Sequence, residues 1–304
     1  MLRITSSQAH PLFDIAATRR LERSAAAALP PHTLMQRAGL ATARLALALA
    51  PHARTIWVAC GPGNNGGAGL GAAAQLQRWG KNTVVTWLGD EGSSPPDSVA
   101  ALTQARQAGV RFVPEPPAGL APQDLCIDAL LGIGASRAPQ GRMAQWIDEL
   151  QRSTATVLAV DVPSGLNADT GTIATTSVAN HETPIRTEGH FHDQHTLSLL
   201  TLKPGLFTAQ GRDGAGQVWF DDLGVASAGE TPVAMLSAPA TTRARLHATH
   251  KGSYGDVAVI GGAPGMTGAA LLAGSSALHV GAGRVFVALL DPAAPSVDMQ
   301  QPEL

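Results

Sequence analysis

The first two hydrophobic stretches of the chain have helical spacing. Apolar residues recur every three to four positions over 15–28, and again from Thr33, where Leu34, Ala38 and Leu45 lie on one face. This spacing predicts two helices. From residue 55 the pattern changes to short, uninterrupted apolar runs, which are typical of strands buried on both faces of a sheet.

Apolar runs and helical segments then alternate through the middle of the chain. Strands are expected at 55–60, 83–88, 110–113, 124–128 and 156–160, closing strands at 196–202 and 218–220, and helices at 70–79, 99–108 and 143–150, with a glycine-rich loop over 61–71. This alternation predicts an α/β fold with a Rossmann-like, doubly wound and mainly parallel sheet that has helices on both faces.

The pattern lapses over 172–195, which is polar and without periodicity. We assign 1–225 to a first domain and 226–242, rich in Ala, Ser and Pro, to a linker. Residues 243–304 contain a second strand–loop–helix–strand pattern. A unit this short cannot bury both faces of its strands, so we expect an incomplete C-terminal α/β fragment.

Composition and charge narrow the class of protein. Hydrophobic residues make up 44% of the 304 positions, and the formal net charge is −2. The balance gives no electrostatic footprint for nucleic acid or an anionic membrane. We see no signal peptide, and Cys60 and Cys126 are in no metal or redox spacing, which favours inert core residues and a reducing compartment. We therefore expect a cytoplasmic enzyme, with a homodimer as the default assembly.

Three loops with unusual chemistry follow predicted strands: 61–69, 128–137 and 161–171. Because parallel strands end at one edge of a sheet, where ligands bind, we expect these loops to meet. Gly61 to Gly66 satisfies the phosphate-binding pattern G-x-G-x-x-G, and Asn64 and Asn65 add amide groups for a polar ligand or a monovalent cation.

Carboxylates follow two further strands. Asp128 is suited to bind a cation or a substrate hydroxyl, or else caps the next helix, and Asp161 has the same placement. Ser164 is outside a nucleophile-elbow context, because Val162 occupies the position that requires glycine. Lys203 follows a strand and is either structural or directed at a ligand.

Histidines gather at 190–195, a stretch that could be read as a zinc site. No strand fixes these ligands and no cysteine lies nearby, so a solvated loop is favoured over a zinc site.

Five motifs in order, spread over about three-quarters of the chain, resemble the NAD(P)H-hydrate epimerase family. They are residues 34–39, 61–70, 128–134, 161–171 and 202–206. Residues 250–255 and 261–270 are similar to the start of the ADP-dependent NAD(P)H-hydrate dehydratase domain. The second resemblance implies that 243–304 is a truncated ribokinase-like fragment, in which ADP or ATP binding and dehydratase (lyase) activity are not expected.

The first resemblance implies an isomerase of nicotinamide nucleotide repair, which interconverts the R and S forms of hydrated NADH and NADPH with potassium (K⁺) as cofactor. It implies K⁺ coordination by Asn65, Asp128 and Ser164. It makes Asp161 the candidate catalytic acid/base. The implied substrate-binding residues are Asn64, Asn65, Gly66, Gly67, Ala68, Gly132, Ile133, Gly134, Ala135, Ser136, Arg137, Ala138 and Asp161.

One position departs from the family pattern. The family motif has Asp where this chain has Ala68. A second hypothesis is therefore a catalytically impaired relative that still binds a nucleotide. A third is an ordinary NAD-dependent oxidoreductase, which the glycine pattern of 61–66 alone would allow.

Overall fold

The computed structural model describes residues 1–134, 137–173, 194–227, 229–239, 244–294 and 297–302. The chain forms two compact units, Met1–Pro239 and Ala240–Leu304. Their boundary lies inside the segment 226–242 that the sequence suggests as a linker. Each unit is described by itself.

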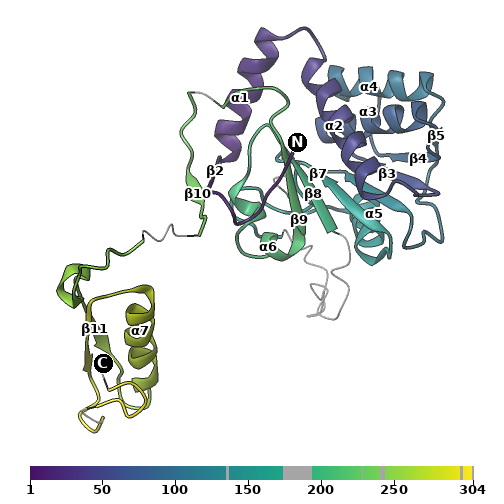
Figure 1. Cartoon of the computed structure of the whole chain (residues 1–304). Coiled ribbons are helices and arrows are strands. Elements are labelled where there is room, and N and C mark those ends of the chain that lie inside the picture. Colours follow the sequence, from purple (N-terminus) through teal and green to yellow (C-terminus); the bar gives the residue numbers. More distant parts are fainter. Residues whose placement is uncertain (135–136, 174–193, 228, 240–243, 295–296, 303–304) are drawn as a thin grey trace. The chain divides into compact units, whose positions relative to one another are not determined.

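Unit 1 is built on a mainly parallel sheet (Figure 1). Within the described residues it has eight strands in the order β1-β9-β8-β7-β6-β3-β4-β5, and only β1 is antiparallel to its neighbour. The strands are β1 (Leu2–Arg3), β3 (Ile56–Cys60), β4 (Thr83–Trp87), β5 (Arg111–Phe112), β6 (Leu125–Ala129), β7 (Thr156–Val160), β8 (Gln194–Leu199) and β9 (Gln217–Asp221). The predicted Rossmann-like α/β fold is confirmed.

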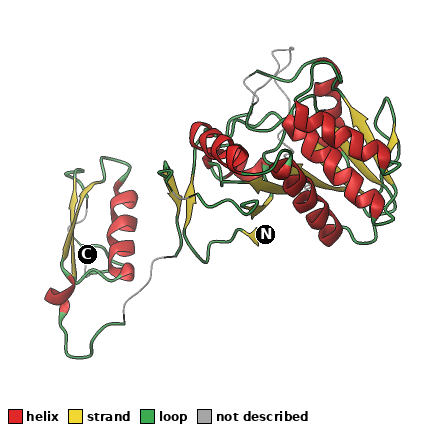
Figure 2. Cartoon of the chain, turned by 90° about the horizontal axis from the view of Figure 1, so that it is seen from above, coloured by secondary structure: helices red, strands yellow, loops and turns green. Residues whose placement is uncertain are grey.

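Helices cover both faces of this sheet (Figure 2). The helical elements of unit 1 are α1 (Ile15–Ala28), α2 (Thr33–Leu49), α3 (Asn64–Arg78), α4 (Pro96–Gln107), α5 (Gly141–Arg152), the 3₁₀ turn η1 (Pro204–Leu206) and α6 (Gly211–Gly214). Strand β3 shows how the faces divide. Ile56, Val58 and Cys60 belong to the cluster with α2, α3 and α4, whereas Trp57 and Ala59 belong to the cluster with α5. The alternation follows from the two-residue period of a strand.

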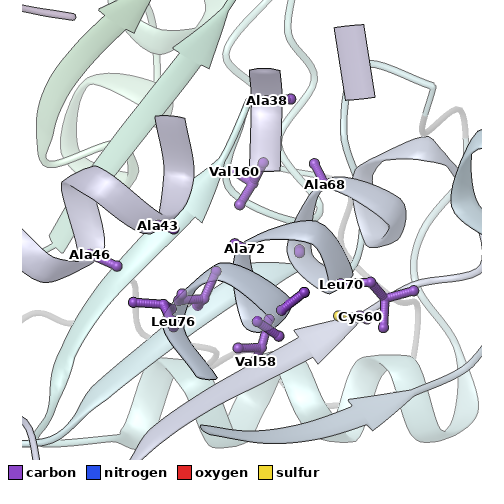
Figure 3. Close-up of a cluster of buried hydrophobic side chains, with 14 of the residues drawn as sticks. Ala38, Ala43, Ala46, Val58, Cys60, Ala68, Leu70, Ala72, Leu76 and Val160 are labelled. Atoms are coloured by element: carbon purple, nitrogen blue, oxygen red, sulfur yellow. The ribbon is translucent and has the colours of Figure 1, made fainter. Parts of the chain in front are cut away.

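Small side chains fill the core between the sheet and helices α2 and α3. Figure 3 shows alanines of both helices gathered over Val58, Cys60 and Val160, among leucines of α3. Because the alanine side chain is only a methyl group, the helices can lie close to each other and to the sheet. This agrees with a composition that is only 4% aromatic.

Helix α3 begins at Asn64, so the expected glycine loop over 61–71 is too long and the helix expected at 70–79 starts too late. Helix α3 has glycine at several of these positions because neighbouring segments leave no space there for a side chain. A Cβ on Gly66 would lie 1.9 Å from the carbonyl oxygen of Gly61, and one on Gly69 would lie 2.5 Å from the Cβ of Ala129. They therefore serve close packing.

A small two-stranded sheet completes unit 1. Strand β10 (Ala234–Leu236) pairs antiparallel with β2 (His10–Leu12). Because β10 lies within the segment 226–242, this part of the segment belongs to unit 1.

Unit 2 is a parallel strand pair with one helix. It contains η2 (Lys251–Tyr254), β11 (Asp256–Gly261), α7 (Thr267–Val280) and β12 (Arg284–Leu289). Helix α7 contacts both strands. Ile260, Phe286 and Leu290 are exposed, as expected for a unit too small to bury both strand faces.

None of the helices in the described parts of the chain is long and apolar enough to cross a membrane. Both cysteines, Cys60 and Cys126, are buried free thiols, and burial raises the pKa of each, that of Cys126 to about 12. Neither is a reactive thiol at neutral pH.

The crossing of α2 and α3 provides a matched test of packing. A Cβ on Gly39 would lie 2.9 Å from the backbone carbon of Gly71, whereas a Cβ on Gly71 meets nothing closer than 3.4 Å. We expect Gly39→Ala to lower the free energy of unfolding by about 1–3 kcal/mol through overpacking. Gly71→Ala should be neutral or stabilising, because alanine favours the helix. Urea unfolding of both variants measures the difference, and equal stabilities would contradict this packing.

Candidate functional site

A cavity of about 770 Å³ opens at the carboxyl edge of the sheet in unit 1. The loops that follow β3, β6 and β7 meet there, as their shared strand direction requires. Their lining residues are Pro62, Gly63, Asn64, Asn65, Leu130, Leu131, Gly132, Ile133, Gly134 and Asp161. The same edge binds ligands in other doubly wound sheets.

Asp128 and Ser164 form a buried hydrogen-bonded pair beneath this edge. The Ser164 hydroxyl donates to Oδ1 of Asp128 at 2.6 Å, and the Ser164 backbone N–H donates to Oδ2 at 2.9 Å. The Leu130 N–H donates to Oδ1 at 3.2 Å. Burial raises the pKa of the Asp128 carboxyl, and the hydrogen bonds from Ser164 oppose that rise. Asp128 therefore binds the Ser164 loop and does not act as a helix cap.

Asn65 joins this group through Leu131. Its Nδ2 donates to the Leu131 carbonyl at 2.9 Å, while the Leu131 N–H donates to Ser164 Oγ at 2.9 Å. An amide oxygen, a carboxylate and a hydroxyl are thus gathered around one short loop. Asp128 has no ion-pair partner among the described residues.

A buried carboxylate without a cationic partner, set among neutral oxygen donors, fits a hard cation held by oxygen ligands. Nitrogen and sulfur ligands for a transition metal are missing from this group. Across the described ranges no cluster of three His, Cys, Asp or Glu side chains could hold a metal ion. The three residues named from the sequence as cation ligands are therefore chemically compatible with potassium.

Asp161 is held at the cavity wall by a buried lysine. Lys203 is completely buried, and its Nζ donates to Oδ1 of Asp161, to the Leu199 carbonyl at 2.6 Å and to Ser198 Oγ at 3.4 Å. Asp161 itself has φ +69°, a left-handed conformation that Asp adopts more readily than most residues. Lys203 thus positions the carboxylate of Asp161 from the side away from the cavity. Of the two roles predicted for Lys203, structural or directed at a ligand, the structure favours the structural one.

The other oxygen of Asp161 faces the glycine loop. The Ile133 N–H lies 3.4 Å from Oδ2, and a Cβ on Gly132 would lie 3.3 Å from Oδ2 and 3.2 Å from Asn65 Oδ1. Gly132 therefore separates the amide of Asn65 from the carboxylate of Asp161 while it leaves both at the cavity.

Some residues of the segment 64–68 line the cavity, and others pack against neighbouring segments. Asn64, Asn65 and Ala68 line the cavity. A Cβ on Gly66 would meet the Gly61 carbonyl, and one on Gly67 would meet Met35 and Ser98. Ala68 is 3% exposed and belongs to the alanine-rich core.

The remaining expected site residues are distributed as follows. Gly132, Ile133 and Gly134 line the cavity, and Arg137 and Ala138 are not among its lining residues. Ala135 and Ser136 lie outside the described residues, as do His190 and His192 of the zinc alternative. His195 lies in β8, where its Nδ1 accepts a hydrogen bond from Trp219 at 3.3 Å.

One wall of the cavity was not expected from the sequence. Thr18, Arg19, Glu22 and Ala26 of α1 line it, together with residues 29–35 and Asp97. The three-to-four-residue spacing of the α1 set indicates one helical face. That face is of mixed polarity, so a search for hydrophobic periodicity passes over it.

The fold is that of a Rossmann-like protein, and the cavity at the carboxyl edge of its sheet is a candidate small-molecule site. The chain belongs to the family described as YjeF-related protein N-terminus, which matches residues 31–205.

Two similar proteins are each named bifunctional NAD(P)H-hydrate repair enzyme Nnr. The one from Escherichia coli is 38% identical over 290 aligned residues, and the alignment covers 91% of this chain and 53% of that protein. The one from Coxiella burnetii is 33% identical over 302 aligned residues, and the alignment covers 96% of this chain and 59% of that protein. The chain thus spans little more than half the length of these relatives.

A solved yeast protein, ynu0 (YNL200c), shares the fold. It is 19% identical, with a TM-score of 0.54 over 69% of this chain and 86% of that one.

Proposed function

We propose that unit 1 is an NAD(P)H-hydrate epimerase, which interconverts the R and S forms of hydrated NADH and NADPH. Membership of the YjeF-related family and the similarity to bifunctional NAD(P)H-hydrate repair enzymes support this assignment. The observation that carries it is the placement of Asp161, fixed by Lys203 beside Asn65 at the wall of a cavity large enough for part of a nucleotide.

Asp161 is the proposed catalytic acid/base. Loss of the hydroxyl group from the hydrated ring leaves a cation, and the carboxylate stabilises that charge where it develops. Water returns to the ring carbon from either side, with a carboxylate to accept its proton. Because Lys203 holds Asp161 from behind, its carboxylate is pre-oriented before the substrate binds.

Asn65, Asp128 and Ser164 are the proposed ligands of potassium. When bound, the ion supplies positive charge next to the nucleotide and an electrostatic anchor for the loop after β6. Support comes from the buried carboxylate of Asp128, which has no ion-pair partner among the described residues, and from the neutral oxygen atoms beside it. Cytoplasmic location and homodimer assembly remain part of this proposal.

A second candidate function follows from Ala68. Its side chain lines the cavity at the position where the family motif has Asp. A chain that binds the hydrated nucleotide without interconverting its isomers would fit that difference. In this case Ala68→Asp should create the epimerisation that the wild-type chain lacks.

The direct test follows the conversion of R-hydrate to S-hydrate in potassium buffer, with a separate dehydratase trapping the S form. The spontaneous rate is subtracted, so the enzyme-dependent increment is measured. We expect an increment for the wild type and a loss of about 10²-fold or more for Asp161→Asn, the range of general acid–base catalysis. Binding without an increment would favour the second candidate, and neither binding nor an increment would reject both.

Potassium is tested by thermal unfolding, independently of activity. A ligand that binds only the folded state stabilises it, by about 2.7 kcal/mol at 100 times its Kd. We expect the Tm to rise with potassium, compared with choline at equal ionic strength, and we expect Asp128→Asn to abolish the rise. Asp148→Asn, which changes a partly exposed carboxylate on α5 that pairs with Arg152, should retain it. A potassium effect that survives in Asp128→Asn would contradict the site.

A further inference from the structure

A second carboxylate, that of Glu22 on α1, lines the same cavity as Asp161. Glu22 lies on α1 in the cavity-lining set with Thr18 and Ala26, at intervals of four residues. The hydroxyls of Thr18 and Thr201 are hydrogen-bonded at 2.7 Å, which fastens this face of α1 to the segment just before Lys203. The segment of Thr201 and Lys203 thus contacts both the helix that carries Glu22 and the carboxylate of Asp161.

The Glu22 carboxylate does not hold together any of the chain that the structure describes. It is half-buried, and among the described residues it has neither a hydrogen bond nor an ion pair. Its neighbour Arg20, by contrast, is paired with Glu230 at 2.7 Å. Removing a carboxylate from water without a partner costs stability. A polar substrate in the cavity would supply such a partner.

The electrostatic surroundings separate the two carboxylates. Burial raises the pKa of Glu22, and the charge of Asp161 adds to the rise, as does Asp97 to a lesser degree; Lys203 and Arg19 oppose it. Asp161, in contrast, accepts a hydrogen bond directly from the Lys203 ammonium. Two carboxyl groups in such different environments are suited to different roles in proton transfer.

Resting on the epimerase function proposed above, we propose that Glu22 is a second catalytic acid/base of the reaction, which donates the proton to the departing hydroxyl while Asp161 serves as the base. The geometry that carries this is one cavity lined by both side chains, one from α1 and one from the end of β7.

The proton and electron balance is complete. As the ring carbon–oxygen bond breaks, its electron pair leaves with oxygen, the Glu22 proton completes a water molecule, and the lone pair of the ring nitrogen forms a carbon–nitrogen double bond. Water then attacks the other side of that carbon, its proton passes to Asp161, and the double-bond pair returns to nitrogen. Glu22 ends ionised and Asp161 protonated. Since both side chains are partly exposed, exchange with water restores the starting state.

The test compares Glu22→Gln with Glu149→Gln, the same chemical change at an exposed position of α5. Circular dichroism and thermal unfolding of the whole chain verify that both are folded. We expect Glu22→Gln to lower kcat for enzyme-dependent epimerisation by about 10²-fold or more with KM changed only a few-fold. We expect no change for Glu149→Gln, and partial recovery of kcat with Glu22→Asp.

The pH profile provides the second measurement. A donor must be protonated, so the wild-type rate should fall as pH rises through the pKa of Glu22, which burial raises from its ordinary value. That descending limb should be missing from Glu22→Gln. A folded Glu22→Gln with wild-type kcat and an unchanged profile would overturn the role of Glu22 alone. Wild-type protein without any enzyme-dependent increment would overturn it together with the epimerase function.

Discussion

The ion pair between Lys203 and Asp161 is the interaction on which the site depends. A completely buried ammonium is tolerated only when its desolvation is offset by close acceptors. Lys203 finds them in Asp161, the Leu199 carbonyl and Ser198. These partners belong to the end of β8 and to the residue after β7, so the pair fixes where two neighbouring strands end. The proposed catalytic carboxylate of Asp161 therefore takes its position from the fold.

A second constraint comes from small residues. Glycines and alanines let α2, α3 and the sheet approach to distances at which most side chains would collide, as at Gly39 and Gly69. Helix α3 begins at Asn64, a short turn after β3 ends at Cys60, and this start places Asn64 and Asn65 at the cavity. The burial of Lys203 and the close packing at glycines thus help to bring together polar groups at the ends of β3, β6 and β7, three strands that are far apart in the sequence.

Much of this arrangement could be predicted from the sequence. Alternating apolar runs identified the parallel sheet, and shared strand direction brought the loops of Asn65, Asp128 and Asp161 to one edge. The predicted start of α3 was wrong because glycines usually indicate a loop. Only tertiary contacts show that this helix needs glycine for close packing. The α1 wall with Glu22 was missed because its mixed polarity has no clear period. The role of Lys203 could not be decided, since burial of a lysine depends on partners that the sequence does not display.

The claim that a buried ion pair organises the site is tested most directly by a double-mutant cycle in chemical unfolding. Lys203→Met keeps the volume but leaves Asp161 without its cation, Asp161→Asn does the converse, and the third protein carries both changes. Breaking one side of a buried pair costs about 3–5 kcal/mol, so we expect Lys203→Met to lose that much and the double variant to lose clearly less than the sum of the two single losses. Strictly additive losses, with Lys203→Met below about 1 kcal/mol, the median for an exposed pair, would contradict the account.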